Sequence, residues 1–429
     1  MQDEFDAIVV GAGPCGSACA LTMAQSGLEV LLIERGRFPG EKNVSGGVIY
    51  GHILNELVPE FWKEAPIERH INRKVISLLT EDSGFSLTFE SSNFDTPPYL
   101  GFSVLRAKFD RWLAQKAVDA GAILATELLV ENVLIESGTI VGVEVGGDMI
   151  RSKVVVAADG VLSRIAQQAG LRQELETNEV SLGVKEVLKL PKETIEERFS
   201  LADGSGFAHE FIGSFTKNVQ GGGFLYSNQD SLSLGIIVQA QSLIDSKQRI
   251  VDLLENFKQH STIAPLIRGA TPIEYSAHLI PEHGLAMSPK LYSDGILVAG
   301  DAAGFVLAAG IILEGNNFAL ASGMIAGQAV ILAKNDNDFS STSLSRYSKL
   351  LDESFVIQDL QTFRHAPNFL SNPRLYSTYP EIICGSLERF FYPKGNPRKP
   401  LWKVIKEEKK GRISLWNIIR DGIKGARTW

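Results

Sequence analysis

The sequence predicts an α/β fold: a Rossmann-like domain, an inserted antiparallel β-sheet domain and a helical C-terminal region. Three observations predict it. A strand–helix–strand pattern with a glycine-rich turn opens the chain within residues 5–34, and buried-strand patterns return at 154–158 and 295–299. Strand-rich stretches lie between these segments. Residues 341–429 have mostly helical patterns.

The individual elements follow from apolar runs, alternation and glycine punctuation. Continuous apolar runs indicate buried strands, loose alternation indicates a hairpin, and runs closed by Gly27 or Gly121 indicate helices. These patterns predict, in chain order, a strand at 5–10, a helix at 17–26, a strand at 28–33, a hairpin at 74–90, a helix at 104–120, short strands within 123–156 with turns at 137–138 and 146–148, strands within 181–238, a strand at 295–299 and a helix at 317–333.

The composition is that of a large globular protein. Of 429 residues, 44% are hydrophobic and 21% are charged, which excludes disordered and fibrous classes. The three cysteines, Cys15, Cys19 and Cys384, are too few for a disulfide framework or for an iron–sulfur cluster held by this chain alone. This cysteine usage favours a reducing cytoplasm.

Neither a signal peptide nor a membrane-spanning helix is expected. The first six residues run directly into a strand pattern. The apolar stretch at residues 302–313 is shorter than the about 20 residues that a span needs, and the sequence of residues 314–317 interrupts it. A metal site is not expected either, because the seven histidines show no ligand spacing.

The charge is unevenly distributed. The net charge is −8, yet residues 394–429 hold eleven basic and three acidic residues, a net +8, which leaves −16 on the rest of the chain. Such asymmetry concerns partners rather than the fold. Nucleic acid is not expected as a partner, because the acidic body would repel its phosphates.

The glycine-rich turn has the spacing of a dinucleotide fingerprint. Gly11 allows a tight turn, Gly13 lets the backbone approach a pyrophosphate, and Gly16 lets helix and strand pack closely. The helix that follows offers free N–H groups to phosphates. Glu34, at the end of the next strand, can accept hydrogen bonds from a ribose 2′-hydroxyl. The alternative is a glycine-rich turn without a ligand.

Two further strand ends carry a carboxylate beside glycine. Asp159-Gly160 follows the strand at 154–158, and Gly300-Asp301 follows the strand at 295–299, with Gly304 close behind. A carboxylate there suits a ribitol or ribose hydroxyl, and neither feature belongs to a simple NAD domain. The two features therefore favour FAD. Asp159 alone could also be an ordinary turn aspartate.

These three motifs resemble known flavoprotein sequences. GAGPCG, ADG and VAGDAAG look like the FAD motifs of the glutathione-reductase-type superfamily, in its aromatic-hydroxylase-like branch. Arg106, in VLRAKFDRWL, resembles the arginine that this branch places near FAD. A helix-capping or surface arginine is the alternative for Arg106.

Longer stretches resemble one family over essentially the whole chain. GEKNVSGGVIYG (40–51), GGGFLYSNQDSLSLGIIV (221–238) and FKQHSTIAPLIRGATPIEYSAHLIPEHG (257–284) look like electron-transferring-flavoprotein:quinone oxidoreductases of the FixC/EtfC type. Members with a fused cluster domain carry several C-terminal cysteines. This chain has only Cys384 in that region, so the resemblance implies a separate ferredoxin-like iron–sulfur partner of the FixX type.

The resemblance implies an FAD-dependent oxidoreductase whose inserted sheet is a substrate or quinone domain. Electrons would pass from an electron transfer flavoprotein or a ferredoxin-like protein through FAD to a membrane quinone. No protein residue is expected to be catalytic, because the flavin carries the chemistry. The implied cofactor-binding residues are Gly11, Ala12, Gly13, Pro14, Cys15, Gly16, Glu34, Arg35, Lys42, Asn43, Val44, Ser45, Gly46, Gly47, Arg106, Val130, Asp159, Gly160, Gly300, Asp301, Gly304, Gly315, Asn316 and Asn317.

The resemblance and the element pattern together predict a chain that passes repeatedly between two domains. Three segments are expected to build the FAD-binding domain, at residues 1–70, 101–180 and 276–340. The β-sheet insertion is expected to begin at 71–100 and to continue as the quinone or substrate sheet at 181–275. The helical C-terminal region, with the basic tail, is expected at 341–429.

Several local features have two interpretations. Residues 315–317 should begin a helix whose N–H groups face the flavin, but Asn316 and Asn317 would also suit an N-cap. The loop at 42–47 could approach the ring or be a plain glycine turn. Cys15 and Cys19 could be a redox dithiol, although buried packing is favoured. His278 is expected to be a hydrogen-bonded structural histidine rather than a proton donor.

The basic tail carries three of the five tryptophans. Leu415, Ile419 and Ile423 share one helix face beside Trp416, with lysines and arginines around them. This combination suits a membrane interface, a protein-docking surface or a helix packed on its own acidic body. We expect a cytoplasmic protein, peripheral on the cytoplasmic face of the membrane.

Two other functions remain open on the sequence alone. Geranylgeranyl reductases, which reduce isoprenoid double bonds, share the FAD motifs. A non-catalytic, FAD-bearing subunit of an electron-transfer complex is the second possibility.

Overall fold

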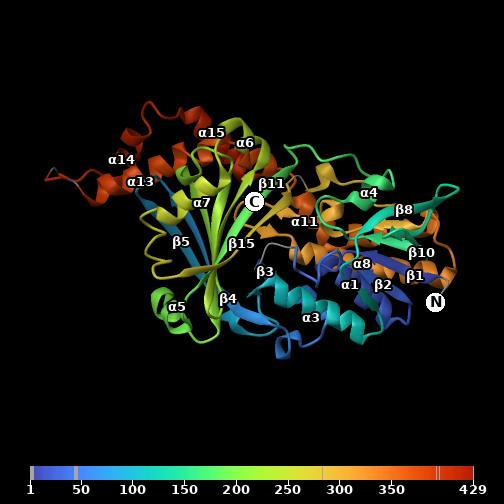
Figure 1. Ribbon diagram of the computed structural model, residues 1–429. Coiled ribbons are helices and arrows are strands. Elements are labelled where there is room, and N and C mark those ends of the chain that lie inside the picture. Colours follow the sequence, from blue (N-terminus) through green and yellow to red (C-terminus); the bar gives the residue numbers. More distant parts are fainter. Residues whose placement is uncertain (1–3, 43–46, 283, 393, 396, 429) are drawn as a thin grey trace.

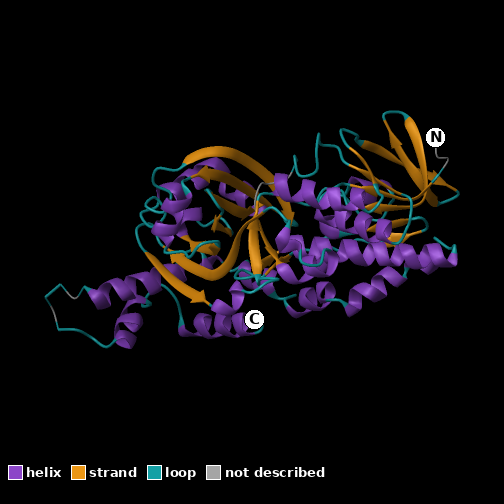
Figure 2. Ribbon diagram, turned by 90° about the horizontal axis from the view of Figure 1, so that it is seen from below, coloured by secondary structure: helices purple, strands orange, loops and turns teal. Residues whose placement is uncertain are grey.

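The computed structural model describes residues 4–42, 47–282, 284–392, 394–395 and 397–428. Two β-sheets lie towards opposite ends of the molecule, with helices between and above them (Figures 1 and 2). The described chain forms two hydrophobic cores, a larger one around the first sheet and a smaller one under the second.

The first sheet is Rossmann-like, in the strand order β16-β17-β10-β1-β2-β7. Neighbours from β17 to β7 are parallel. Strands β1, β2 and β17 are short, mostly or fully buried apolar runs, as parallel strands covered on both faces require, whereas the edge strand β7 is partly exposed. Its strands are β1 (Phe5–Val10), β2 (Val30–Ile33), β7 (Ile123–Ala125), β10 (Asp148–Ala157), β16 (Tyr292–Ser293) and β17 (Ile296–Val298), with β8 (Val130–Glu136) and β9 (Thr139–Val145) attached through β10.

Three helices belong to this sheet: α1 (Pro14–Gln25), α3 (Arg106–Asp119) and α8 (Asn316–Asp336). Glycines let α1 and α8 approach closely, since a Cβ at Gly323 would lie 2.2 Å from the carbonyl oxygen of Cys15. Helix α8 is long and apolar enough to cross a membrane, but 72% of its apolar stretch is buried inside the protein. It is therefore the core helix of this domain.

The second sheet has nine strands, in the order β15-β11-β14-β13-β12-β4-β6-β3, with β5 paired to β4. Neighbours are antiparallel except β4 and β12, which run parallel because a long stretch of chain separates them. The strands are β3 (Gly47–Tyr50), β4 (Ile67–Leu79), β5 (Gly84–Glu90), β6 (Gly101–Val104), β11 (Val180–Lys189), β12 (Ser205–Gly213), β13 (Gly221–Ser227), β14 (Ser231–Gln239) and β15 (Thr271–Pro281).

Helices and short strands complete the fold, and the mostly helical character predicted after residue 340 is confirmed. Between the strands lie α2 (Gly51–Leu57), α4 (Arg164–Gln168), α5 (Lys192–Phe199), α6 (Ala240–Ser246), α7 (Ile250–Gln259) and the small pair β18 (Leu307–Ala308) and β19 (Leu313–Glu314). The C-terminal region holds α9 (Ser341–Leu344), α10 (Arg346–Glu353), α11 (Phe355–Thr362), α12 (Ala366–Leu370), α13 (Thr378–Phe391), α14 (Leu401–Glu408) and α15 (Leu415–Ala426).

Most predicted elements are present. The hairpin predicted at 74–90 is β4 and β5, and the turns at 137–138 and 146–148 join β8, β9 and β10. The division into domains remains a prediction. Strands β3 and β6 lie within segments assigned by sequence to the FAD-binding domain, yet both pair in the nine-stranded sheet.

Candidate functional site

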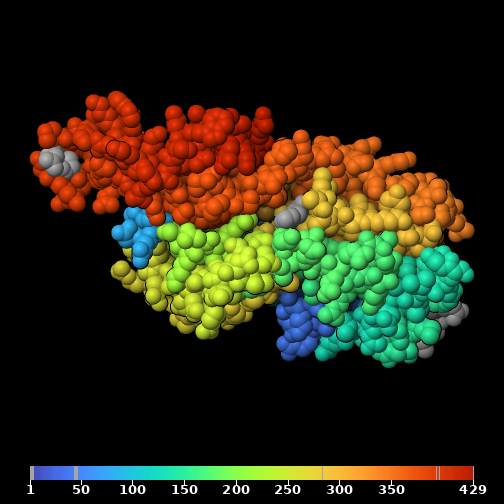
Figure 3. Space-filling view, turned by 90° about the horizontal axis from the view of Figure 1, so that it is seen from above, coloured from blue at the N-terminus to red at the C-terminus, as the bar shows by residue number. Residues whose placement is uncertain are grey.

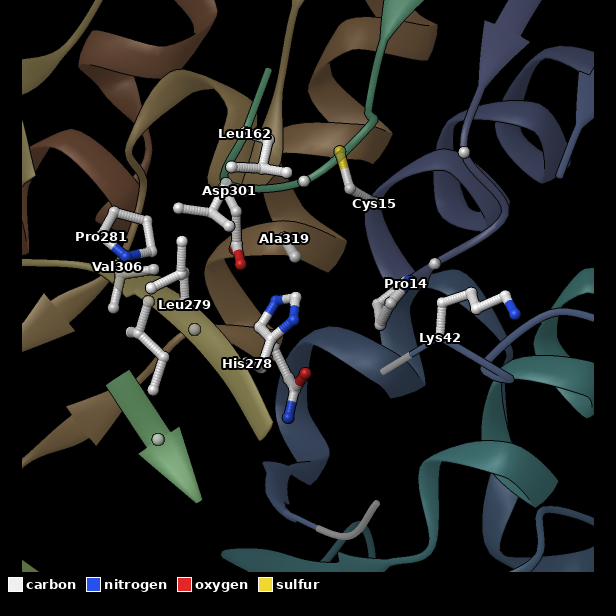
Figure 4. A pocket seen from close by; sticks show the side chains of 18 of the residues that line it. Pro14, Cys15, Lys42, Leu162, His278, Leu279, Pro281, Asp301, Val306 and Ala319 are labelled. Carbon is white, nitrogen blue, oxygen red and sulfur yellow. The ribbon is translucent and has the colours of Figure 1, made fainter. Parts of the chain in front are cut away.

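A cavity of about 590 Å³ lies between the two sheets. On one side are residues that follow the carboxyl ends of β1, β2 and β10, together with the start of α8; on the other is one face of the nine-stranded sheet. Figure 4 shows Pro14, Cys15 and Lys42 across from Leu279 and Pro281. Open α/β sheets bind ligands at the carboxyl ends of their strands, so the position suits a nucleotide cofactor.

Fifteen residues of the sequence-based site line this cavity: Gly11, Gly13, Pro14, Cys15, Glu34, Arg35, Lys42, Gly47, Arg106, Val130, Asp159, Gly160, Asp301, Gly315 and Asn316. Five others do not line it: Ala12, Gly16, Gly300, Gly304 and Asn317. Asn43, Val44, Ser45 and Gly46 fall outside the described residues. The fold thus brings most of the set together, while their individual roles toward the cofactor stay predictions.

The three glycines of the fingerprint meet different neighbours. Gly11 has φ +102°, and a Cβ there would lie 2.5 Å from the carbonyl oxygen of Ala158. A Cβ at Gly16 would lie 1.8 Å from the carbonyl oxygen of Gly11. At Gly13 a Cβ would meet only Arg106 Nη2, at 3.9 Å, so the space in front of it opens into the cavity. Gly11 and Gly16 serve the turn, and Gly13 leaves room for a ligand.

Glu34 ties the turn to the end of β2. Its Oε2 accepts a hydrogen bond from the backbone N–H of Ala12 (3.0 Å), and its Oε1 accepts one from that of Gly36 (2.7 Å). Glu34 is buried and lines the cavity. Each carboxylate oxygen has a second lone pair, so a ribose hydroxyl can still donate to it.

The two aspartates at strand ends are both partly buried. Asp159 Oδ2 accepts a hydrogen bond from the N–H of Ile165 (3.1 Å), while Oδ1 has no partner among the described residues. Burial raises the pKa of Asp159 to about 6. Burial also raises the pKa of Asp301, and the Arg106 guanidinium opposes that shift. Asp159 therefore serves the local turn and also presents an unpaired oxygen at the cavity.

Arg106 is neither a cap nor a surface residue. It is the first residue of α3, and its guanidinium donates two hydrogen bonds to Asp110 (2.7 and 2.8 Å). A third reaches Asn316 Oδ1 at 3.0 Å, which joins α3 to the start of α8. The fully buried carboxylate of Asp110 holds the cation at the cavity wall.

Helix α8 begins at the cavity without a capping side chain. Its N-cap is Gly315, so the sequence-based alternative in which Asn316 or Asn317 caps the helix is wrong. Asn317 instead accepts a hydrogen bond from the N–H of Tyr50 (3.0 Å) and donates one to Glu314 (3.0 Å). Asn317 thus connects β3, of the second sheet, to α8. The positive end of the α8 dipole faces the cavity.

Cys15 and Cys19 behave as packing residues. Neither forms a disulfide, both are buried, and Cys15 Sγ lies 4.0 Å from Ser322 Oγ of α8. Burial raises the pKa of Cys15 to about 12 and that of Cys19 well above its usual value. Thiols that stay protonated are poor nucleophiles, so the buried-packing interpretation is favoured over a redox dithiol.

His278 projects into the cavity from β15 (Figure 4). Burial, with smaller effects of Arg106 and Arg35, lowers its pKa to about 4, so the ring is neutral at pH 7. The expectation of a hydrogen-bonded structural histidine finds no support, since among the described atoms no hydrogen bond of the ring is seen.

Sequence reasoning missed the contribution of the second sheet. Ser181, Lys185, Phe224, Tyr226 and Glu282 line the cavity from this sheet and the residue that follows it. None stands in a recognisable motif. The signal available was strand alternation, which puts Lys185 on one face, but alternation does not say which face meets a cofactor.

The residues present fit FAD. Arg35 and Lys42 add positive charge near the glycine turn, and the exposed Leu128 and Leu129 offer apolar surface beside Glu34. The open space at Gly13 and the unpaired oxygen of Asp159 are what a pyrophosphate and a hydroxyl-bearing chain would require.

The chain matches known proteins along its whole length. An FAD dependent oxidoreductase model matches residues 6–195, and the ETF-QO/FixC family C-terminal domain matches residues 366–429. The "Probable electron transfer flavoprotein-quinone oxidoreductase YdiS" of Escherichia coli K12 is 42% identical over 425 residues, covering 99% of both chains. Protein FixC of Azotobacter vinelandii is 38% identical over 428 residues, again covering 99% of both. This chain belongs to the ETF-QO/FixC family.

Solved structures share the fold of this ETF-QO/FixC protein. A geranylgeranyl bacteriochlorophyll reductase-like protein of Thermoplasma acidophilum aligns with TM-score 0.70 and 21% identity, covering 95% of this chain and 96% of the other. The myxobacterial halogenase CndH aligns with TM-score 0.67 and 19% identity, covering 95% and 96%. At such identities the likeness concerns the fold alone.

The family identifies the chain as an FAD-dependent oxidoreductase. Bound FAD supplies the redox chemistry, and the protein binds, orients and shields it. The glycine turn and α1 would hold the pyrophosphate, Glu34 the adenosine ribose, and the start of α8 with Arg106 the far end of the cofactor.

Proposed function

We propose that this protein takes electrons from an electron transfer flavoprotein or a ferredoxin-like protein and passes them through FAD to a membrane quinone. The observation that carries the proposal is the two-sided cavity. One side has the turns and carboxylates that FAD needs; the other is a sheet face lined by Phe224, Ile237 and Leu279, which suits an apolar acceptor ring. The name of the YdiS relative, a probable electron transfer flavoprotein-quinone oxidoreductase, supports the electron transfer flavoprotein as donor and the quinone as acceptor.

The positions of the cysteines support a separate iron–sulfur partner. Cys384 is buried on α13, its sulfur 3.9 Å from the carbonyl oxygen of Leu78, and the other two cysteines lie in α1. Sequence-distant thiols on different helices do not make a four-cysteine cluster site. A partner of the FixX type would bring its own cluster.

The C-terminal helices support a peripheral position on the membrane. One face of α15 packs on the protein: Asp421 accepts hydrogen bonds from Arg374 (2.7 and 2.8 Å) and from the Tyr379 hydroxyl (2.8 Å). Gly425 packs against the ring of Phe369. The tail therefore has a fixed inner face, as one of the three sequence-based alternatives expected, and an outer face left for another surface.

That outer face is apolar and basic. The exposed apolar residues are Leu401, Trp402 and Ile405 of α14, Leu415, Trp416, Ile419 and Ile423 of α15, and Phe391 and Tyr392 at the end of α13. Exposed lysines such as Lys403, Lys406 and Lys424 lie among them. Figure 3 shows these helices as a continuous layer reaching beyond the body. Tryptophan with lysine suits an anionic bilayer surface.

Strand β5 extends this apolar surface. Its residues Phe85, Leu87 and Phe89 are exposed on one side of the strand, and β5 lies beside α13 (Figures 1 and 3). A bare apolar edge strand is a liability in water, and a membrane would cover it. We infer that this side meets the cytoplasmic face of the membrane.

The test uses the purified FAD-loaded protein with its partner flavoprotein under anaerobic conditions. We expect the partner to bleach the flavin absorbance and a short-chain benzoquinone to restore it over many turnovers. A flavin that stays oxidised while the partner turns over would instead favour the non-catalytic subunit. If the partner reduces the flavin but no quinone reoxidises it, the assignment of a quinone as the electron acceptor is refuted.

A further inference from the structure

The nine-stranded sheet presents one lysine to the cavity among the described lining residues. Lys185, on β11, is 1% exposed and lines the cavity. It lies directly opposite Ser276 of β15 and Gly235 of β14, and its ammonium is 5.9 Å from the centre of the Phe224 ring. The other cationic side chains that line the cavity belong to the nucleotide side: Arg35, Lys42, Arg106 and Arg164.

A buried lysine is costly where an apolar residue would serve. Val184 and Val187 of the same strand are buried and apolar, and the adjacent buried Glu186 is paired with Lys258. Removing an ammonium from water destabilises its charged form, so strands rarely carry one in a core without a use for it. The position of Lys185 at the cavity, rather than in the smaller core, indicates that the use lies in the cavity.

The groups facing Lys185 suit an amine that gains and loses a proton near neutral pH. Burial lowers its pKa to about 7; Glu274 of β15 opposes this shift, and Arg106 of α3 reinforces it. His278, further along β15, is neutral, and Phe224 and Gly235 carry no charge. Glu274 is exposed, so bulk water reaches its carboxylate.

We propose that Lys185 is the acid that protonates the acceptor quinone in the cavity. This deepens the proposed function and rests on it. Reduction of a quinone to a quinol takes up two electrons and two protons. Both electrons and one proton come from the reduced FAD, which becomes oxidised. The second proton passes from Lys185 Nζ to a carbonyl oxygen, leaving a neutral amine that takes a proton back from water beside Glu274.

The experiment compares three variants with the wild-type holoprotein. Lys185→Met removes the amine, Lys185→Arg keeps a charge that does not release its proton near pH 7, and Lys189→Met is the control on the same strand. Lys189 is exposed and pairs with Asp230. Each protein is reduced anaerobically and mixed with a short-chain benzoquinone, or with ferrocenium, which takes electrons without a proton. FAD content and binding of a non-reducible quinone analogue are measured separately.

With wild type, the rate of reoxidation by quinone should fall as pH rises through about 7, because the lysine loses its proton. Lys185→Met and Lys185→Arg should both react about 100-fold more slowly at pH 6, without that pH dependence. FAD content, analogue binding, reoxidation by ferrocenium and the control variant should be unchanged.

Three outcomes would overturn the inference. If both variants keep the wild-type rate and pH profile, Lys185 is not the acid, although quinone reduction itself stands. If ferrocenium and quinone rates fall together, or FAD is lost, the lysine acts on the cofactor. If wild type reduces no quinone, the inference and the proposed function fail together.

Discussion

At the scale of single residues, the site separates positions required by the fold from positions required by the ligand. Gly11 and Gly16 are surrounded by backbone at distances that no side chain tolerates. Gly13 has extended backbone, φ −76° and ψ −174°, which any residue adopts, and almost nothing faces its missing Cβ. We therefore expect any requirement for glycine at position 13 to come from the cofactor.

This difference gives a direct prediction for Gly13→Val. The variant should fold and be soluble, because an added Cβ would meet no protein atom closer than 3.9 Å. Its FAD content after purification should fall at least about tenfold, since the side chain occupies the approach to the pyrophosphate. Absorbance at 450 nm and apo-protein melting are the measurements. Gly422→Val, where nothing lies within 4 Å, should remain fully yellow; full FAD content in Gly13→Val would refute the placement.

At the scale of elements, close helix contacts set the position of the cofactor site. Helices α1 and α8 both begin at the cavity, and they touch through Gly323 and Gly327 against the backbone of Cys15 and Cys19. Because both helix N-termini depend on this contact, the site is only as well ordered as the packing between them.

We therefore expect Gly323→Ala to damage the site without touching the cofactor. Its Cβ would lie 2.2 Å from the Cys15 carbonyl oxygen, so the helices must separate, at a cost of about 1–3 kcal/mol. Melting temperature and FAD affinity should both fall. Gly422→Ala is the matched control on an exposed helix and should leave both unchanged; an unaltered melting curve for Gly323→Ala would show that the contact is looser than described.

The junction between α15 and the body should depend on pH. Hydrogen bonds from Arg374 and Tyr379 outweigh burial and lower the pKa of Asp421 to about 2. A carboxyl group with a depressed pKa stabilises the folded state above its ordinary pKa of about 4, and that stabilisation is lost as pH falls towards 2. The attachment of α15 should accordingly be constant at neutral pH and weaken in acid.

Asp421→Asn should imitate the acid state at pH 7. Loss of the charged acceptor removes hydrogen bonds worth about 1.5–3 kcal/mol each, so limited proteolysis within α15 should accelerate about 10-fold or more. FAD content should stay normal, because α15 does not line the cavity. Glu407→Gln, which changes a half-exposed carboxylate on α14, is the control. Equal cleavage rates in the two variants would contradict the prediction that Asp421 holds α15 on the body of the protein.

At the scale of the whole molecule, the exposed apolar and basic side chains of the C-terminal helices gather on one outer surface. The nucleotide domain and the nine-stranded sheet meet around one cavity, while the outer surface of α14, α15 and β5 gathers exposed apolar residues. Every acidic residue of the tail is paired: Glu407 and Glu408 with Arg389, and Asp421 with Arg374. The outward lysines are thus left to dominate the charge of that face.

Membrane contact through this face predicts a specific binding defect. The double variant Trp402→Ser/Trp416→Ser should co-float with vesicles of phosphatidylglycerol and phosphatidylethanolamine several-fold less than wild type. Flotation of wild type should weaken in high salt, because the lysines contribute. Met149→Ser, an exposed apolar residue on the nucleotide domain, should float normally. If the double variant floats as well as wild type, the membrane contact is refuted, and the outer face of α14 and α15 is better explained as a surface for a protein partner.

Much of the nucleotide half could be predicted from sequence. The strand–turn–helix around Gly11, the carboxylates after the strands and the helix start at Asn316 are local signals, because short-range sterics and strand ends dictate them. The family resemblance was also carried by contiguous stretches of sequence. These local signals and the resemblance predicted the fold class, FAD as the cofactor, and most of the residues on the nucleotide side of the cavity.

Only the tertiary structure decided what faces the cofactor from the second sheet and which side of the tail is buried. Lys185 stands in an ordinary strand, and nothing near it in sequence marks it. Its role depends on the register that sets it opposite Ser276 and on the packing that turns this face to the cavity. Asp421 likewise finds Arg374, 47 residues away, only after the helices pack. Such contacts join distant segments and form through burial, which local sequence patterns do not encode.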